Sequence, residues 1–366
     1  MVYHVIGLMS GSSLDGLDIC FAHLHEARGK WKYEIVASNC IAYTSDLAYR
    51  LLRAAQLDVS GFLLLHTDYG RWIGERINDF IEQYDLSNKV HFIASHGHTV
   101  YHNPKLRTTS QIGDGATIAA TTGLPVISDL RALDVALGGQ GAPIVPIGDK
   151  LLFGAYDYWL NIGGIVNLTV RKDDQLQAFD VCTGNQALNI LAQKEGQDFD
   201  NNGLLAKRGV VLTDLIGELN SQEYFRKSPP KSLSNDEAKA LVFPALLESP
   251  RDNLDLLRTM VQHIAEQVAL AASRFPHGKD KASMLVTGGG AFNDFLIETL
   301  SSELLPYQIE VVVPREQEVK YKEALVMALI GALRWREETN VLASVTGAQR
   351  DSISGALWMG HSYQPA

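Results

Sequence analysis

The chain has 366 residues, of which 46% are hydrophobic and 20% charged, a composition typical of a globular protein large enough for two domains. A formal net charge of -10 argues against a nucleic-acid-binding protein, although a local site for a small anion is compatible with it. The three cysteines form no C-x-x-C pair, so neither a disulfide framework nor a zinc finger is expected. The N-terminus lacks the pattern of a signal peptide, and the apolar helical stretch 324–333 is too short to span a bilayer. We therefore expect a cytoplasmic protein without a membrane partner.

The first predicted element is a pair of strands joined by a turn rich in glycine and serine. Residues 2–6 form an apolar run, and residues 17–22 alternate in the manner of a strand. Phosphate-binding loops of the P-loop and Rossmann types open a helix instead, so this turn belongs to neither type. One interpretation is an anion-binding nest in which Asp15 and Asp18 hold a hard cation, and the other is a solvated hairpin turn.

The remainder of the first half predicts alternating helices and strands. Apolar and aromatic residues recur at helical spacing over 62–84, which indicates a helix whose aromatic stripe faces the core. The buried strand 90–94 leads into residues 95–97, at the end of a strand where open α/β sheets bind ligands. A strand over 124–127 follows, and the glycine-rich segment 138–143 indicates a domain crossing nearby.

The second half repeats the pattern of the first. A strand over 158–162 is followed by the tight turn Gly163-Gly164 and a second strand over 165–170, and a third strand leads into Asp180. The later predicted elements are a helix near 257–271, a strand over 283–286 that ends in the glycines 288–290, a strand over 309–313 and a helix over 321–336. This similarity indicates an internal duplication of a strand–turn–strand unit.

Three glycine turns are thus predicted, one in the first half and two in the second. Opposed hairpin turns are suited to clamping a polyphosphate from both sides, because small residues leave backbone N–H groups uncovered. The run Gly288–Gly290 would let a flat base approach the backbone closely. Together the three turns favour a nucleotide as the ligand.

A series of short motifs runs through the whole chain. They are residues 7–16, 95–97, 111–114, 128–129 with Arg131 and Asp134, 138–143, 161–165 with Asn167, 179–180, 184–185, 230–232, 288–291 with Asn293, 323–324 and 346–348. In their order and their amino-acid sequences, these motifs resemble those of the anhydro-N-acetylmuramic acid kinase family of the actin-like, sugar-kinase superfamily.

The resemblance implies an α/β fold of two ribonuclease-H-like (actin-like ATPase) domains. Each domain would have a mixed five-stranded sheet flanked by helices, with an ATP cleft between the domains. On this basis we place the N-terminal lobe at residues 1–132 plus 342–366 and the C-terminal lobe at 133–341. The family also implies a homodimer.

The implied reaction is phosphorylation of 1,6-anhydro-N-acetylmuramic acid by ATP with hydrolysis of the anhydro bridge, which yields N-acetylmuramic acid 6-phosphate and ADP in cell-wall recycling. Asp180 lies at the position of the family's general base, although a helix-capping aspartate is the alternative. Arg131 would grip the lactyl carboxylate, or else form an ion pair with Asp129 or Asp134. Glu323 would reach the sugar, or simply place a negative charge at a helix N-terminus.

The resemblance also implies the ligand residues for ATP, Mg²⁺ and the amino sugar. The catalytic residues would be Asp180 and Glu323, and the magnesium ligands would be Asp15 and Asp18. The sugar residues would be Ser95, His96, Gly97, Asp129 and Arg131. The nucleotide residues would be Gly11, Ser12, Ser13, Leu14, Asp15, Gly16, Leu17, Asp18, Gly163, Gly164, Asn167, Gly288, Gly289, Gly290 and Asn293.

Two alternatives come from other functional classes. The chain departs from the family's usual wording at residues 181–183 and 233–236, which motivates a non-catalytic or altered-specificity relative that binds nucleotide and amino sugar. His96 and His98, with His91 and His102 nearby, imitate a zinc pair at a strand end and motivate a metal-dependent hydrolase. The chain nevertheless lacks the eight strand–helix repeats of a barrel hydrolase.

Overall fold

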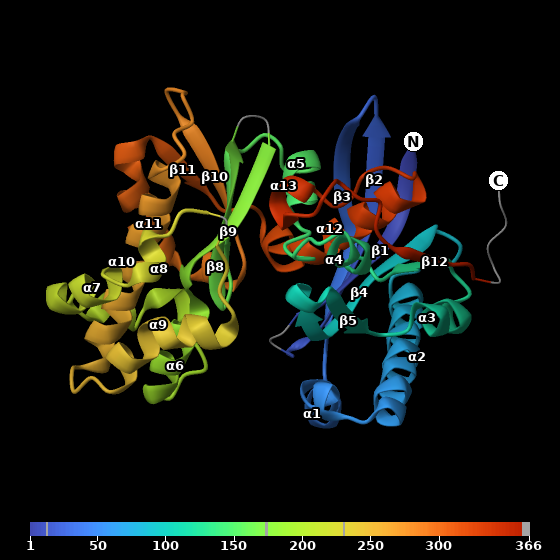
Figure 1. Cartoon of the computed structure of the whole chain (residues 1–366), viewed down its shortest axis with the longest axis horizontal. Helices are drawn as coiled ribbons and strands as arrows, with labels where there is room; N and C mark the ends of the chain where they lie inside the picture. The colour runs from blue at the N-terminus through green and yellow to red at the C-terminus, as the bar shows by residue number, and fades with distance from the viewer. Residues whose placement is uncertain (12–13, 173–174, 230, 361–366) are drawn as a thin grey trace. The chain divides into compact units, whose positions relative to one another are not determined.

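The computed structural model describes residues 1–11, 14–172, 175–229 and 231–360 (Figure 1). The chain divides into two compact units, which we call unit 1 (Met1–Phe153 and Tyr321–Ala366) and unit 2 (Gly154–Lys320). Segments 133–153 and 321–341, which the sequence analysis assigns to the second lobe, group with unit 1 in this division. The second boundary falls inside one long helix, α12 (Glu316–Trp335).

The sheet of unit 1 is mixed, as predicted. Its strands are β1 (Val2–Ser10), β2 (Gly16–Ala27), β3 (Lys30–Ala42), β4 (Phe92–Asn103), β5 (Thr108–Ile112), β6 (Val126–Ser128) and β12 (Ala356–Trp358). The order is β12-β6-β4-β1-β2-β3, with β5 paired to β4. The hairpins β1–β2 and β2–β3 are antiparallel, whereas β4 runs parallel to both β1 and β6. Among the described residues this sheet has seven strands, not the predicted five, because the short strands β5 and β12 join it.

Helices flank the sheet of unit 1, and one of them lies on β1 at Gly7. They are α1 (Ser45–Leu52), α2 (Val59–Gln83), α3 (Gly115–Thr122), α4 (Ala132–Ala136), α5 (Pro146–Leu151), α13 (Ala343–Thr346) and the unit 1 part of α12, with the 3₁₀ turns η1 (Ala54–Gln56) and η2 (Pro104–Leu106). The apolar face of α2 joins the core, as its periodicity predicts. Helix α12 lies directly on β1, since a Cβ atom at Gly7 would be 2.0 Å from the Ala324 carbonyl oxygen.

Unit 2 has the predicted mixed five-stranded sheet over its described residues. Its order is β11-β10-β7-β8-β9, with β7 (Tyr158–Ile162), β8 (Ile165–Lys172), β9 (Gln175–Thr183), β10 (Ala282–Thr287) and β11 (Ile309–Val312). The pairs β7–β8 and β8–β9 are antiparallel, whereas β10 runs parallel to β7 and β11. The three-strand opening of unit 1 therefore recurs here, as the internal duplication predicts.

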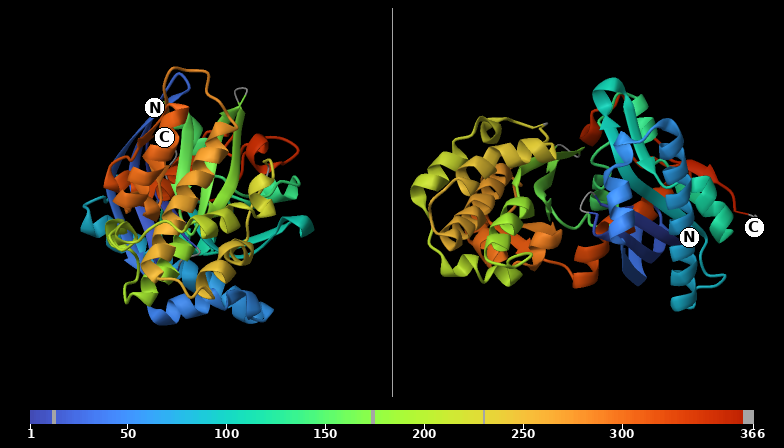
Figure 2. Two further views of the ribbon diagram at one scale, coloured as in Figure 1. Left: turned by 90° about the vertical axis from the view of Figure 1, so that its left-hand side faces the viewer. Right: turned by 90° about the horizontal axis from the view of Figure 1, so that it is seen from below.

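The helices of unit 2 gather against its sheet (Figure 2). They are α6 (Asn185–Lys194), α7 (Thr213–Asn220), α8 (Glu223–Arg226), α9 (Asn235–Leu247), α10 (Asn253–Ser273) and α11 (Asp294–Leu304), with η3 (Asn201–Gly203), η4 (Ala206–Arg208), η5 (Gly289–Phe292) and η6 (Leu305–Tyr307). Helix α10 is the central one, because its apolar residues are buried on most of its surface and contact β8, β9, α6 and α7. In the part of the chain that the structure describes, no helix combines the length and apolar character needed to cross a membrane.

Candidate active site

The predicted glycine and serine turn joins two antiparallel strands. Strand β1 ends at Ser10 and β2 begins at Gly16, with Ser10 paired to Leu17. Two of the predicted nucleotide residues, Ser12 and Ser13, lie outside the described residues. Leu14 adopts a left-handed backbone conformation at φ 58°. Gly16 has no room for a side chain, because a Cβ atom there would be 2.7 Å from the Ile41 carbonyl oxygen.

Burial and two neighbouring carboxyl groups act on Asp18 beside this turn. Burial raises the pKa of Asp18 to about 6, and the negative charges of Asp15 and Glu323 add to the rise. The thiol of Cys40, its partner in the β2–β3 register, opposes the rise by hydrogen bonding to Asp18. Burial likewise raises the pKa of Glu323, which Arg131 counteracts. The turn therefore collects negative charge in a place that is partly shielded from water.

Arg131 is anchored by neighbouring groups on the predicted sugar side. Its Nε donates to His96 Nε2 at 2.7 Å, and its Nη1 donates to the Gly141 carbonyl at 2.5 Å. His96 Nδ1 in turn lies 2.8 Å from the Gly97 carbonyl oxygen, so His96 is the neutral Nδ1–H tautomer. Burial lowers the pKa of His96 to about 3, and the Arg131 charge contributes to this. Burial also lowers the pKa of Arg131 to about 10, against the opposing effects of Glu323 and Asp134.

The two aspartates considered as ion-pair partners of Arg131 bond elsewhere. Asp134 is buried and accepts from the Gly141 N–H and from Thr346 Oγ1, both at 2.7 Å, and thereby fixes the glycine-rich segment. Asp129 is exposed at φ 58° and accepts from Ser128 Oγ at 2.8 Å. Hydrogen bonds to His96 and Gly141 thus position the guanidinium. Ser95, the remaining sugar residue of the prediction, is buried on β4 beside His96.

A hydrogen-bonded chain that the sequence analysis missed lies behind the turn. Tyr43 Oη donates to Ser10 Oγ at 2.7 Å, and Tyr69 Oη lies 2.6 Å from Tyr43 Oη. His98 Nδ1 shares a hydrogen bond of 3.0 Å with the same serine. These groups hold the end of β1 where the turn begins. The helical spacing of 62–84 places Tyr69 in the aromatic stripe of α2, but sequence spacing does not reveal a partner on another element.

Asp180 of unit 2 lies near the end of β9, held by three hydrogen bonds to its backbone and side chain. Its Oδ2 accepts from the Leu233 N–H at 2.8 Å, and its carbonyl accepts from Tyr224 Oη at 2.8 Å. Its own N–H donates to the Lys231 carbonyl at 3.1 Å. Burial raises the pKa of this carboxyl to about 6, although the Leu233 N–H and the Lys231 charge oppose the rise. Asn167, predicted as a nucleotide residue, is the β8 partner of Asp180 in the register.

The two glycine turns of unit 2 lie together at the end of β7. A Cβ atom at Gly290 would be 2.2 Å from Ile162 Cγ2, so the late turn touches the residue just before Gly163. Gly288 has φ 84°, a conformation that favours glycine. The carbonyls of Gly163 and Gly164 accept from the N–H groups of residues 185 and 184, at the start of α6. Gly289 is exposed, which leaves its backbone open to a ligand.

Asn293 has a structural role at the start of α11. Its Oδ1 accepts from the Leu296 N–H at 2.9 Å, which makes it the N-cap of the helix. The side chain is only 8% exposed. Because Asn293 follows the Gly288–Gly290 turn, this cap fixes the backbone where the chain leaves the turn and enters α11.

The histidines that motivated a zinc hydrolase have other partners. His96 bonds Arg131, His98 bonds Ser10, and His102 Nδ1 lies 2.9 Å from Thr109 Oγ1. Within the described ranges, His91, His96, His98 and His102 do not come together as a group of three metal-ligating side chains. The hydrolase hypothesis thus loses the cluster on which it depended.

Comparisons with known proteins agree with the motifs. The family model for anhydro-N-acetylmuramic acid kinase matches residues 3–360. A protein of that name from Francisella tularensis subsp. novicida is 30% identical, with 97% of this chain and 98% of the relative covered. One from Mannheimia succiniciproducens is 30% identical over 98% and 99% of the two chains, and one from Bacillus cereus is 28% identical over 96% and 98%.

The solved structures that align with this chain are less similar to it in sequence than the curated relatives are. Component A of (R)-2-hydroxyglutaryl-CoA dehydratase from Acidaminococcus fermentans has a TM-score of 0.47 and 16% identity, covering 89% of this chain and 96% of that one. A ROK family glucokinase from Streptomyces griseus has a TM-score of 0.41 and 12% identity, covering 90% and 99%. The full-length family match and the curated relatives decide the assignment: the chain belongs to the anhydro-N-acetylmuramic acid kinase family and is a sugar kinase.

Proposed function

We propose that this kinase uses ATP to phosphorylate 1,6-anhydro-N-acetylmuramic acid and hydrolyses the anhydro bridge in the same reaction. Water adds to the anomeric carbon, the bridge oxygen leaves that carbon, and the same oxygen attacks the γ-phosphate. The products are N-acetylmuramic acid 6-phosphate and ADP. The observation that carries the proposal is the setting of Asp180, a half-buried carboxyl in a strand-end position of a chain that matches the family over its whole length.

Asp180 is the proposed general base that activates the water. One carboxylate oxygen is fixed by the Leu233 N–H, which orients the group. A pKa of about 6 leaves the carboxylate ionised at neutral pH, yet more basic than an ordinary aspartate. Lys231, whose own pKa burial lowers to about 8, keeps the Asp180 pKa from rising further. The segment 233–236 departs from the usual family sequence, but it contributes to this contact through the backbone N–H of Leu233. Any residue except proline provides that N–H.

Arg131 is the proposed ligand of the lactyl carboxylate of the sugar. A guanidinium fork suits a carboxylate, and the bonds to His96 and Gly141 hold it in one orientation. Ser95, Gly97 and Asp129 complete the proposed sugar residues together with His96. Glu323 lies close enough to influence the pKa values of Arg131 and Asp18, so we assign it to the same region as a catalytic residue.

The turn at Gly11–Asp18 is proposed to bind the nucleotide phosphates in unit 1. The glycine turns Gly163-Gly164 and Gly288–Gly290 are proposed to bind the nucleotide in unit 2, with Asn167 and Asn293. Asp15 and Asp18 fit a magnesium ion, because they are oxygen donors and because a cation would offset the burial and the carboxylate repulsion that raise the Asp18 pKa. The ion would neutralise charge on the transferred phosphoryl group.

The test is to incubate the purified chain with ATP, Mg²⁺ and the anhydro sugar and to look for ADP and a sugar phosphate in equal amounts. Tight ATP binding without product, over a range of amino sugars, would contradict the proposal and favour a nucleotide-binding sensor. The full-length family match does not favour that alternative. We also propose a cytoplasmic homodimer, which sedimentation and fractionation would test.

A further inference from the structure

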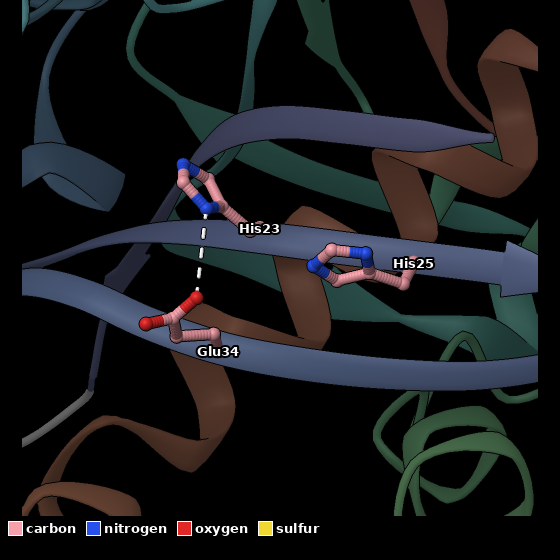
Figure 3. A group of neighbouring side chains, drawn as sticks. All are labelled: His23, His25 and Glu34. Carbon is pink, nitrogen blue, oxygen red and sulfur yellow. Dashed lines mark ion pairs between the residues drawn. The ribbon is translucent and has the colours of Figure 1, made fainter.

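Three side chains that the kinase site does not use meet on β2 and β3. His23 and His25 are two positions apart on β2, so they project from the same face of the sheet (Figure 3). Glu34 on β3 is the register partner of His23, and its Oε2 lies 3.7 Å from His23 Nδ1. One donor atom from each of the three residues lies within 4.8 Å of the other two. Over the described ranges, this is the one such group of three.

Aromatic neighbours hold the most buried member of this group. His4, the β1 partner of His23, stacks on it with ring centroids 4.1 Å apart, and Phe21 contacts it edge-on at 5.4 Å. His91 stacks on His4 at 4.6 Å and extends the row of rings. The ring of His23 is therefore fixed before any ligand arrives. His25 and Glu34 are exposed, so they are free to adjust and leave the group open to solvent.

Burial and neighbouring charges both act on the group. Burial and the neighbouring His4 lower the pKa of His23, whereas Glu34 opposes this. Lys32 and Lys30, the β3 partners of His25 and Ala27, bring positive charge to the same face, and Glu34 brings a carboxylate.

We infer that His23, His25 and Glu34 form a binding site for a divalent transition-metal ion, for which Zn²⁺ is the best match. Two imidazoles and one carboxylate are a known donor set for zinc, with a fourth position for water. Magnesium and calcium prefer sites made of oxygen atoms, so the ion of the kinase reaction is not expected here. Small rotations of the two exposed side chains would bring the donors to about 2 Å from one ion.

The site is separate from the carboxyl groups of the phosphate turn. Asp18 precedes His23 by five positions on β2, which corresponds to roughly 17 Å along a strand. A bound ion would join β2 to β3 beside the hairpin turn between Ala27 and Lys30. Because the three donors meet only when β2 and β3 are paired in the native register, the ion would bind the folded chain and not the unfolded one. Binding would therefore stabilise the fold.

The experiment measures Zn²⁺ binding to the chelator-stripped chain without nucleotide, in excess Mg²⁺ and in a Cys40→Ser background that removes the exposed thiol. We expect one Zn²⁺ per chain. His25→Ala and Glu34→Ala should each weaken binding by at least roughly 10-fold, since even outer-shell partners contribute that much. Lys32→Ala is the matched control, because it changes an exposed partner in the same register without removing a donor. It should bind Zn²⁺ equally well or more tightly.

Thermal unfolding separates metal binding from damage to the fold. Zn²⁺ should raise the Tm of the parent chain and of Lys32→Ala, and should leave the Tm of His25→Ala and Glu34→Ala unchanged. In the presence of a chelator all four chains should unfold at similar temperatures, because the altered side chains are exposed. Absence of Zn²⁺ binding to the parent chain, or equal affinity in His25→Ala and Glu34→Ala, would overturn the inference.

Discussion

Asp18 in unit 1 and Asp180 in unit 2 are partly buried carboxyl groups whose pKa is raised to about 6, mainly by burial. Their surroundings differ in sign. Asp15 and Glu323 add negative charge around Asp18, whereas Lys231 and the Leu233 N–H stabilise the charged form of Asp180. The same pKa therefore describes two different sites. Around Asp18, the carboxylates of Asp15 and Glu323 raise the pKa, and a bound cation would offset them. Around Asp180, Lys231 of the same unit lowers the pKa, and the carboxylate is suited to accept a proton.

The largest effect should come from removing the proposed base. Asp180→Asn keeps the shape of the side chain but cannot accept a proton from water, so kcat should fall by roughly 10² to 10⁴, the usual contribution of a general base. Calorimetry should detect unchanged ATP binding in this variant. A kcat close to that of the parent chain would remove Asp180 from the mechanism and would end the functional contrast with Asp18.

Changing the other carboxyl group should alter the metal requirement instead. Asp18→Asn removes one proposed magnesium ligand and relieves repulsion with Asp15 and Glu323, so the Mg²⁺ concentration for half-maximal activity should rise at least roughly 10-fold. Steady-state rates at varied Mg²⁺ measure this. Asp46→Asn is a matched control on an exposed helix N-terminus of the same unit. An unchanged Mg²⁺ dependence in Asp18→Asn would contradict the assignment of the ligand.

The pH dependence should follow Asp180. Because a base acts only when deprotonated, kcat/KM should fall about tenfold per pH unit below its pKa of about 6. Lys231→Met removes a charge that lowers this pKa, so the acid limb should move to higher pH. Lys239→Met, an exposed change on α9, should leave the limb in place. A limb that stays fixed in Lys231→Met would show that another group titrates there.

A smaller effect is expected on stability. The folded-state pKa of Asp18 is raised above its ordinary value, so at pH 7 the folded chain bears the cost of keeping a partly buried group ionised. Asp18→Asn should therefore increase the free energy of unfolding of the metal-free chain at pH 7 by about 1 kcal/mol after allowance for solvent screening. The Tm should rise accordingly. The gain should disappear as the pH falls through 6 towards 4, where the parent aspartate also becomes neutral. Scanning calorimetry at several pH values measures this gain. A gain of the same size at every pH would contradict the role of the Asp18 charge.

Local sequence patterns predicted the elements better than the contacts between them. Alternation identified the hairpin around the first glycine turn, the strand–turn–strand repeat identified β7, β8 and β9, and the family resemblance implied the five-stranded sheet of unit 2. The strands β5 and β12 were missed, because β5 is largely polar and both are short. The continuous apolar pattern of α12 gave no sign that the boundary between the units falls inside it.

The site was predictable where the chain brings groups together within one motif. Arg131 and the Gly138–Pro143 segment are near in sequence, and the Asp134 contact to Gly141 follows from that proximity. The Leu233 contact to Asp180 spans 53 positions and depends on how a loop returns to β9. The metal-site residues on β2 and β3 required the strand register, which shifts at a bulge between Phe21 and Ala22. The His23-x-His25 pattern was the available signal.

The contact between Gly7 and Ala324 has a mechanical consequence. Real Cβ atoms essentially never approach another heavy atom within 3.0 Å, whereas one at residue 7 would meet the Ala324 carbonyl oxygen at 2.0 Å. Any side chain at residue 7 would therefore push α12 away from β1 and carry Glu323 with it. The absence of a side chain at Gly7 therefore sets the spacing between the carboxyl groups of Asp18 and Glu323. A single methyl group added at this position should therefore change the affinity of the proposed magnesium site without altering Asp15 or Asp18.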